Sequence, residues 1–154
     1  MNVIFSDEQT RTIDGDALVA LTRRVLSHER YPDQTEVSIT AVSDEVIASL
    51  KSEHLGVAEP TDVLSFPIED LTPGVPPASS AHGPPILLGD VVIAPDFISR
   101  QAGEHGVSED EELLLMVVHG ILHLMGWDHE DDAEAEAMEQ REREILALVG
   151  VDRR

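Results

Sequence analysis

Residues 118–129 read VHGILHLMGWDH, and this stretch constrains the fold more than any other part of the chain. It holds three of the seven histidines. His119 and His123 are four positions apart, so on an α-helix they lie one turn above each other and can share a metal ion. On a continuous helix His129 would lie roughly 15 Å beyond His119, at about 1.5 Å per residue. The helix must therefore end between His123 and His129 if the three imidazoles are to bind one ion.

Gly126 lies where the chain has to turn back. Helices often end with a residue in the left-handed conformation, which glycine adopts at little cost. Ligand spacing and glycine position together predict one site formed by His119, His123 and His129. The alternative is three unconnected histidines, and the spacing on one apolar helix argues against it. The chain has no cysteine, so its metal ligands must be His, Asp or Glu, which suits zinc or another divalent transition metal.

The composition indicates one acidic domain, residues 1–154, which is long enough for a single core. Aromatic residues make up only 3%, so the core must consist of Leu, Val, Ile and Ala. The net charge of −21 argues against broad nucleic-acid binding, which depends on Lys and Arg, but leaves room for a local basic groove. The N-terminal residues do not resemble a signal peptide, and no stretch approaches a transmembrane length. We therefore expect a cytoplasmic protein.

Hydrophobic periodicity predicts the element order β-α-β-α-β-β-α-α-α, which implies a mixed α/β sheet of four strands packed with helices. On the same pattern, Val46 and Leu148 are expected on the inner faces of the second and the last helix. The predicted strands are residues 2–5, residues 37–41, a short strand that ends at Pro67, and residues 86–93. The predicted helices begin near Asp14, Ser43, Pro95, Ser108 and Ala133, and residues 70–85 form an exposed loop.

The helix that carries His119 and His123 is predicted to be buried in the middle of the fold. Ser108 and Glu111 have the spacing of a capping box, and the following residues 113–118 (LLLMVV) are apolar on all sides. The strand at 86–93 is nearly continuous in apolar residues and is expected to be central. Its only charge, Asp90, is either paired within the fold or directed into a site, and the sequence leaves both readings open.

The histidine spacing also matches the metzincin pattern H-E-x-x-H-x-x-G-x-x-H. However, Gly120 replaces the glutamate that should follow the first histidine. Without this carboxylate the protease mechanism lacks its proton acceptor. A zinc with three protein ligands keeps a fourth position open for a water that it activates. We therefore expect a hydrolytic reaction other than peptide cleavage, with a metalloprotease-like hydrolase as one alternative.

Three segments resemble the YbeY family of bacterial endoribonucleases. Residues 119–129 (HGILHLMGWDH) are similar to its signature H-G-x-L-H-L-x-G-[YW]-D-H, and residues 60–67 (PTDVLSFP) to its P-T-[DN]-V-[LM]-S-F-P block. Residues 88–93 (LGDVVI) are similar to its L-G-D-I-V-I strand. The resemblance implies a zincin-like α/β (α+β) fold with the HxxxH helix at its centre. It also implies one zinc ion per chain, held by the three histidines.

The same resemblance implies zinc-dependent cleavage of single-stranded RNA in ribosome maturation. The expected tasks are processing of the 3′ end of 16S rRNA and a part in ribosome quality control. The implied partners are rRNA and the small ribosomal subunit, with ribosomal proteins or an assembly GTPase as further candidates and no DNA or membrane. A second alternative is a non-catalytic ribosome-assembly factor whose zinc is structural.

The remaining candidate residues carry weaker signals. Asp128 either orients a ligand imidazole, accepts a proton or binds backbone amides in a turn, and we favour a structural or orienting role. Ser65 and Phe66 are weak candidates for substrate contact, because their strand would border the cleft. Trp127 is expected to pack in the core. Leu55 occupies a position where many family members carry an arginine thought to help in catalysis or RNA contact. The other four histidines are expected to be surface residues: His28, His54, His82 and His105.

Overall fold

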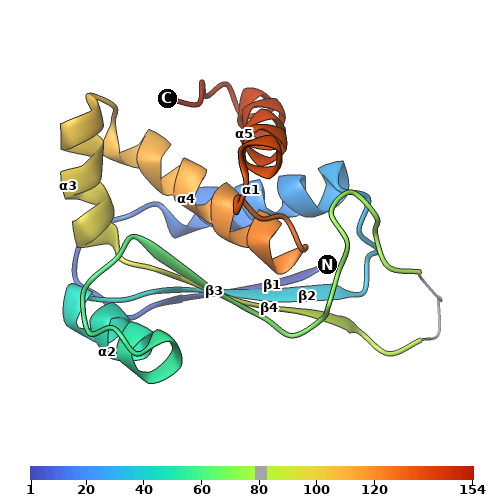
Figure 1. The fold of residues 1–154 in the computed structure, drawn as a ribbon, viewed down its shortest axis with the longest axis horizontal. Helices are drawn as coiled ribbons and strands as arrows, with labels where there is room; N and C mark the ends of the chain where they lie inside the picture. The colour runs from blue at the N-terminus through green and yellow to red at the C-terminus, as the bar shows by residue number, and fades with distance from the viewer. Residues whose placement is uncertain (79–82) are drawn as a thin grey trace.

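Four strands form one mixed sheet in the computed structural model (Figure 1). The strand order is β1-β2-β4-β3, in which β1, β2 and β4 are parallel and β3 is antiparallel at one edge. The strands are β1 (Asn2–Asp7), β2 (Thr35–Ala41), β3 (Val63–Pro67) and β4 (Ile86–Ile93). The prediction of a four-stranded mixed sheet is therefore confirmed, and so is the interior position of the strand at 86–93.

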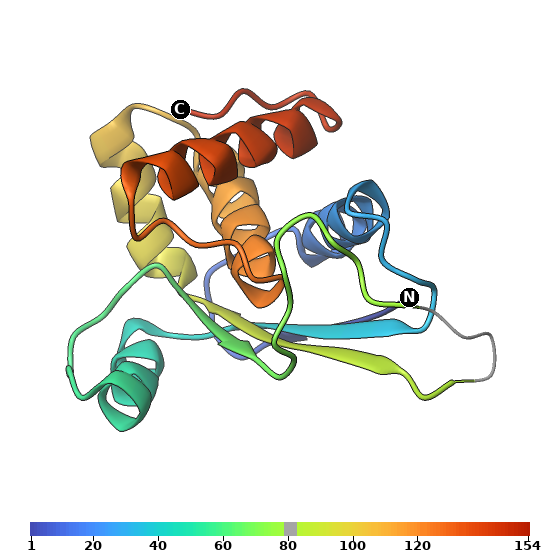
Figure 2. The same cartoon turned by 45° about the vertical axis from the view of Figure 1, so that its right-hand side comes forward.

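The structure describes residues 1–78 and 83–154, and in this part five helices surround the sheet. Helices α1, α3, α4 and α5 lie on one side of the sheet and α2 on the other (Figures 1 and 2). The helices are α1 (Gly15–His28), α2 (Asp44–Leu55), α3 (Pro95–His105), α4 (Glu109–Leu124) and α5 (Asp132–Ala147). The element order agrees with the prediction. No helix in the described ranges combines the length and the apolar character needed to cross a membrane.

Helix α4 lies at the centre of the helical layer. It packs on β3 and β4 and contacts α1, α3 and α5, and Figure 2 shows it between the sheet and α5. The hydroxyl of Ser108 accepts a hydrogen bond of 3.1 Å from the backbone N–H of Glu111, as the capping-box spacing predicts. Most of the apolar residues in the helix are fully buried. The prediction that the histidine helix is the most enclosed one is confirmed.

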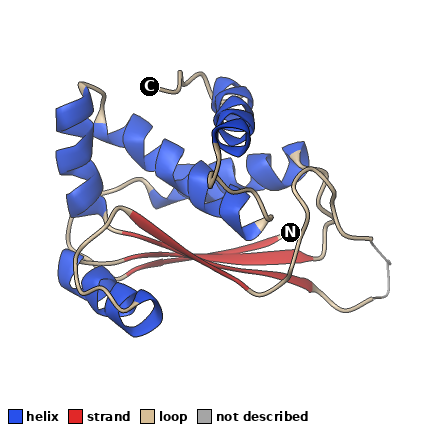
Figure 3. Ribbon diagram, in the orientation of Figure 1, coloured by secondary structure: helices blue, strands red, loops and turns tan. Residues whose placement is uncertain are grey.

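Two predictions of side-chain placement are wrong. Val46 is exposed, because α2 covers only one end of the sheet and buries only Ile47 fully (Figure 3). Leu148 is also exposed, because it lies at the C-cap, beyond the last turn of α5. The buried residues of α5 are Met138, Glu142, Ile145 and Leu146.

Asp90 does not face the histidines. It is exposed on the side of the sheet that carries α2, where it shares a surface hollow with His54 and Phe66. Its Oδ1 accepts a hydrogen bond of 2.7 Å from the hydroxyl of Ser38 on the neighbouring strand. Of the two readings that the sequence leaves open, pairing within the fold therefore describes this carboxylate.

Candidate metal centre

The end of α4 brings the third histidine back toward the first two. The N–H of Trp127 donates to the carbonyl of Leu122 (3.0 Å), and the N–H of Gly126 donates to the carbonyl of His123 (3.1 Å). This is the paired hydrogen bonding of a Schellman turn, and Gly126 takes the left-handed conformation that it requires, with φ of 96°. A Cβ at Gly126 would also collide with the carbonyl oxygen of Leu71. The predicted helix end and the reason for the glycine are thus confirmed.

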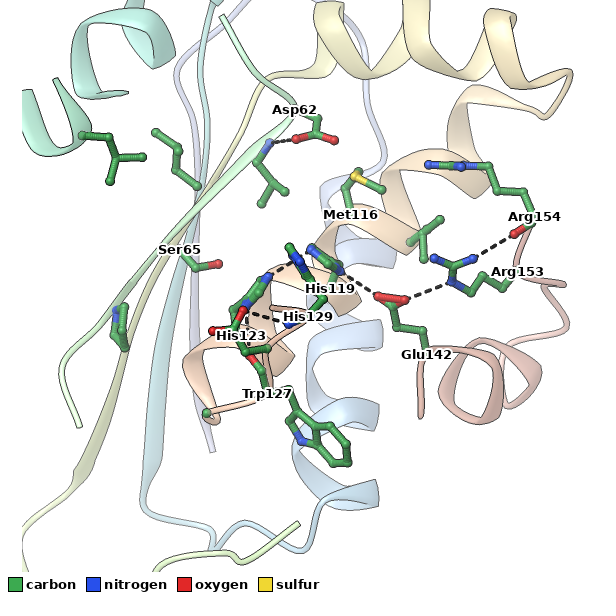
Figure 4. A pocket seen from close by; sticks show the side chains of 17 residues that line it. Asp62, Ser65, Met116, His119, His123, Trp127, His129, Glu142, Arg153 and Arg154 are labelled. Carbon is green, nitrogen blue, oxygen red and sulfur yellow. Dashed lines mark hydrogen bonds and ion pairs between the residues drawn. The ribbon is translucent and has the colours of Figure 1, made fainter. Parts of the chain in front are cut away.

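His119, His123 and His129 lie together and could bind a metal ion (Figure 4). One ring nitrogen from each lies within 4.8 Å of the others. The Nε2 atoms of His119 and His123 are only 3.0 Å apart. The ring of His129 lies 5.4 Å from that of His119 and 5.0 Å from that of His123, measured between centroids. One ion can therefore be reached from all three side chains.

The other nitrogens of the first two rings are held by hydrogen-bond acceptors. The Nδ1 of His119 lies 2.8 Å from Oε2 of Glu142, and the Nδ1 of His123 lies 2.9 Å from the carbonyl oxygen of Trp127. Because a carboxylate and a carbonyl only accept, each Nδ1 carries the proton and each Nε2 presents a lone pair. Two lone pairs facing each other at 3.0 Å repel unless a cation lies between them. This arrangement fits a bound metal ion, whose histidine ligands are commonly fixed in this way.

The surroundings of His123 favour its neutral, ligating form. Burial lowers the pKa of His123, and the imidazole of His119 acts in the same direction, so this ring is neutral at neutral pH, as a ligand must be. Burial alone would raise the pKa of Glu142. Hydrogen bonds from His119 and Arg153 and the charge of Arg153 outweigh that effect, and the pKa lies below its ordinary value. The carboxylate behind His119 is therefore ionised.

The histidines open into a pocket of about 860 Å³. Its walls come from the end of α2, strand β3, helix α4, the turn after α4, helix α5 and the segment after α5. Leu55 lines it, as do the two arginines that follow α5. The other lining residues are Asp62, Val63, Leu64, Ser65, Pro67, Leu115, Met116, His119, His123, Gly126, Trp127, Asp128, His129 and Glu142.

The structure separates the two weak substrate-contact candidates. Ser65 lines the pocket, and its hydroxyl donates a hydrogen bond of 2.8 Å to the carbonyl of Gly120 in α4. Phe66 does not line the pocket. Its ring lies on the opposite side of the sheet, 4.8 Å from that of His54 in α2. The two side chains diverge because successive residues of a strand point to opposite faces.

Asp128 and Trp127 support the turn that carries His129. The Oδ1 of Asp128 accepts a hydrogen bond of 2.8 Å from the backbone N–H of His129, which is the turn interaction considered above. The ring of Trp127 is half-buried against the core, and the guanidinium of Arg141 lies 4.9 Å from its centroid.

Gly120 faces the sheet and not the pocket. A Cβ at this position would lie 2.7 Å from Cγ1 of Val91 and 3.1 Å from Cγ2 of Val63. Glycine therefore allows α4 to approach the sheet closely. Any larger side chain there would collide with Val91 unless the helix shifted, which explains why glycine and not glutamate suits this position.

Glu142 was not predicted from the sequence, although it belongs to the centre. The sequence does contain a sign of its burial. Glu142 lies four positions after Met138 and three before Ile145, so it falls on the apolar inner face of the last helix. No local pattern pointed to Arg153 and Arg154, whose contacts are made with distant parts of the chain.

The four remaining histidines have different surroundings. His54 and His105 are exposed, as predicted. His28 is half-buried, and its Nδ1 lies 2.8 Å from Oε2 of Glu29. His82 lies outside the described residues.

The fold and the histidine group define a class of protein, a mixed α/β domain with a pocket in which three imidazoles could hold a metal ion. A family model described as "Endoribonuclease YbeY" matches residues 4–150. The chain belongs to the endoribonuclease YbeY family. The endoribonuclease YbeY of Micrococcus luteus is 41% identical over 138 residues, which cover 90% of this chain and 85% of that protein. The endoribonuclease YbeY of Moorella thermoacetica is 41% identical over 157 residues, covering 99% and 100%.

A solved structure shares the fold. The solution structure of TM1509 from Thermotoga maritima superposes with a TM-score of 0.60 at 25% sequence identity, covering 96% of this chain and 91% of that one. The matched region contains all three segments that suggested the family, so the resemblance is confirmed. Because the relatives are named endoribonucleases, the chain is a member of an enzyme family.

Proposed function

We propose that this chain is a zinc-dependent endoribonuclease that cleaves single-stranded RNA. The observation that carries the proposal is the pair of imidazoles in one pocket, with both Nδ1 atoms engaged and both Nε2 atoms facing each other at 3.0 Å. Membership of the family and the names of its relatives support RNA as the substrate.

In this proposal His119, His123 and His129 hold one zinc ion per chain. A divalent ion there supplies a Lewis acid that polarises a phosphoryl oxygen and makes a nucleophile available at neutral pH. The chain's own groups orient the ligands. Glu142 fixes the ring of His119, and the Trp127 carbonyl fixes that of His123. Asp128 holds the turn that presents His129, which supports an orienting role.

The free edge of β3 is the proposed substrate-binding element. The N–H of Ala94 donates to the carbonyl of Asp62, and the N–H of Ile68 donates to that of Leu88. Because the pattern alternates in an antiparallel pair, the backbone groups of Ser65 point away from β4 toward the free edge. In this proposal its N–H donates to an RNA phosphate oxygen, whereas its hydroxyl is already bonded to the carbonyl of Gly120 in α4. Phe66 has no part in this contact, because its ring lies on the α2 side of the sheet.

We propose further that the RNA is ribosomal and that the protein acts in the cytoplasm, in maturation of the 3′ end of 16S rRNA and in ribosome quality control. Family membership supports this assignment. The net charge of −21 favours docking through basic ribosomal proteins over broad contact with RNA alone. An assembly GTPase is a further candidate partner.

The proposal is tested with purified chain, zinc, and matched single- and double-stranded RNA. We expect cleavage of the single strand only, and loss of cleavage in His123→Ala with an unchanged circular dichroism spectrum. His54→Ala is the matched control, because this histidine is exposed on the far side of the sheet. Cleavage by His123→Ala at the rate of the unsubstituted chain would mean that a contaminating nuclease is responsible.

One observation favours a second candidate, because a free strand edge beside a metal site also suits an extended peptide. Zinc-dependent cleavage of a peptide library, with no cleavage of RNA, would establish a metalloprotease-like hydrolase. The position of Gly120 against the sheet weighs against it. An assembly factor with a structural zinc would need a fourth protein ligand, and the group found in the described ranges contains three histidines alone.

A further inference from the structure

Two arginines after α5 each hold a buried carboxylate. The Nε of Arg153 donates to Oε1 of Glu142 at 2.9 Å, and the Nε of Arg154 donates to Oε1 of Glu112 at 2.7 Å. Each glutamate side chain is only 1% exposed. The segment that carries the arginines turns back along α5 toward the start of α4 (Figure 2). The two ion pairs therefore fasten the same segment to two different helices.

Each of the two carboxylates also contacts a histidine, but only one of these is a candidate ligand. The Oε2 of Glu142 lies 2.8 Å from Nδ1 of His119. The Oε2 of Glu112 lies 2.9 Å from Nδ1 of His105, which is not in the metal-binding group. These two arginine–glutamate–histidine series have the same form, and one of them ends at the candidate metal centre (Figure 4).

We propose that Arg153 is a positioning residue of the metal centre, which holds Glu142 so that Glu142 keeps the Nε2 of His119 directed at the ion. This inference rests on the metal of the proposed function. Arg153 touches neither the ion nor the substrate in this role, and it acts through two successive hydrogen bonds.

The geometry explains why a guanidinium suits the task. The carboxylate of Glu142 is bonded at one oxygen by Arg153 and at the other by His119, so its rotation about the last side-chain bond is fixed. Arg153 is itself fixed, because Nη1 donates to the carbonyl of Arg154 at 2.9 Å and Nη2 lies 3.7 Å from Oε1 of Glu139. A planar group with several donors can satisfy all these partners at once, whereas an ammonium group is a point charge on a flexible stem.

Without Arg153, one oxygen of a buried carboxylate loses its partner. The group is then free to rotate toward water, since a buried charge without a partner is costly. This rotation weakens the hydrogen bond that orients His119. Loss of an outer partner of a metal-binding histidine typically lowers metal affinity by about 10–100-fold.

The test compares Arg153→Gln with Arg154→Gln in the full chain. The zinc dissociation constant is measured by competition with a fluorescent chelator, and the visible spectrum of the cobalt(II) form reports the ligand geometry. We expect about tenfold weaker zinc binding in Arg153→Gln, the lower end of the usual range for an outer partner. We expect an altered cobalt spectrum in the same variant. Arg154→Gln should keep the affinity and the spectrum of the unsubstituted chain, and Arg153→Lys should recover part of the affinity.

The matched variant separates positioning from general stability. Both substitutions remove an ion pair to a carboxylate that is 1% exposed, so both should lower the thermal midpoint of the metal-free protein. Equal zinc affinities in the two variants, whether unchanged or equally reduced, would overturn the inference. Failure of the unsubstituted chain to bind zinc would overturn the proposed function as well. Normal zinc results without RNA cleavage would leave this inference standing and refute only the proposed reaction.

Discussion

On one side of the sheet α4 lies directly against β3 and β4, whereas on the other side α2 covers only one end (Figures 1 and 3). The difference appears in neighbouring residues of the same strand. Val91 is fully buried beneath α4, while Asp90 is exposed on the α2 side. Likewise Ser65 binds the histidine helix, and Phe66 packs beside α2. A short sequence motif can therefore contain residues with unrelated tasks, because strand geometry sends them to opposite faces.

The packing on the α4 side also holds the candidate metal centre in place. The centre lies on a helix that is packed against the sheet, against three other helices and, through Glu142 and Arg153, against the segment after α5. The α2 side has one small cluster around Ile47. We therefore expect substitutions on the α4 side to cost more than equivalent substitutions where packing is open.

Gly120→Ala should have the largest effect on stability. Its Cβ would lie 2.7 Å from Cγ1 of Val91, a β-branched residue with no exposure and little freedom to move. Such overpacking costs about 1–3 kcal/mol in the free energy of unfolding. The matched control is Gly103→Ala in α3, where a Cβ meets nothing within 4 Å, and a gain of up to about 1 kcal/mol is expected from helix propensity. Urea denaturation of the two variants measures the difference.

Equal stabilities of Gly120→Ala and Gly103→Ala, which share the same gain in helix propensity, would show that α4 accommodates the added methyl group at no cost. In that case the α4 side of the sheet would not be more tightly packed than the α2 side.

The dependence of the unfolding free energy on pH, at acid pH, tests the difference between a buried carboxylate on the α4 side and an exposed one on the α2 side. Burial alone would raise the pKa of Glu112, but hydrogen bonds from Arg154 and His105 and the charge of Arg154 bring it below its ordinary value of 4.5. The folded chain then binds fewer protons than the unfolded chain, so this group contributes stability above its ordinary pKa and loses it as the pH falls toward the folded pKa. We expect the free energy of unfolding to decline below pH of about 4.5, and to decline less steeply in Glu112→Gln.

Asp90→Asn removes a charge of the same sign at an exposed position and serves as the control for the change in net charge. The quantity compared is the slope of the unfolding free energy against pH, measured on metal-free protein. A slope for Glu112→Gln as steep as that of the control would show that the ionised carboxylate of Glu112 does not stabilise the fold.

Much of the fold could be predicted because its signals are local. Ser108 caps the helix that the capping-box spacing predicts, and Gly126 ends it where the third histidine requires. Strand 86–93 agrees in both bounds. The hydrogen-bond partners of the histidines could not be predicted. Glu142 and Arg153 reach His119 only through tertiary packing. The side chain of Phe66 lies on the α2 side, beside His54, because successive side chains of a strand alternate between its two faces.

The smallest expected effect is on substrate binding and concerns Leu55, which links the α2 side of the sheet to the pocket. It is the last residue of α2, yet its side chain lines the pocket and is 62% exposed. Leu55→Arg therefore sacrifices little packing and adds a planar cation that can bind a phosphate at two points. An exposed ion pair contributes up to about 1 kcal/mol, so KM for single-stranded RNA should fall by about two- to fivefold at low salt. The gain should shrink as salt is raised.

Val57→Arg is the matched control for this experiment. It introduces the same charge two positions further along the chain, at a residue that is 47% exposed and does not line the pocket. If both variants lower KM equally, the gain reflects the reduced net charge of an acidic protein, and Leu55 has no special position. If only Leu55→Arg lowers it, the bound phosphate lies within reach of the end of α2. In that case RNA enters the pocket from the α2 side, although the three candidate metal-binding histidines all lie on the α4 side.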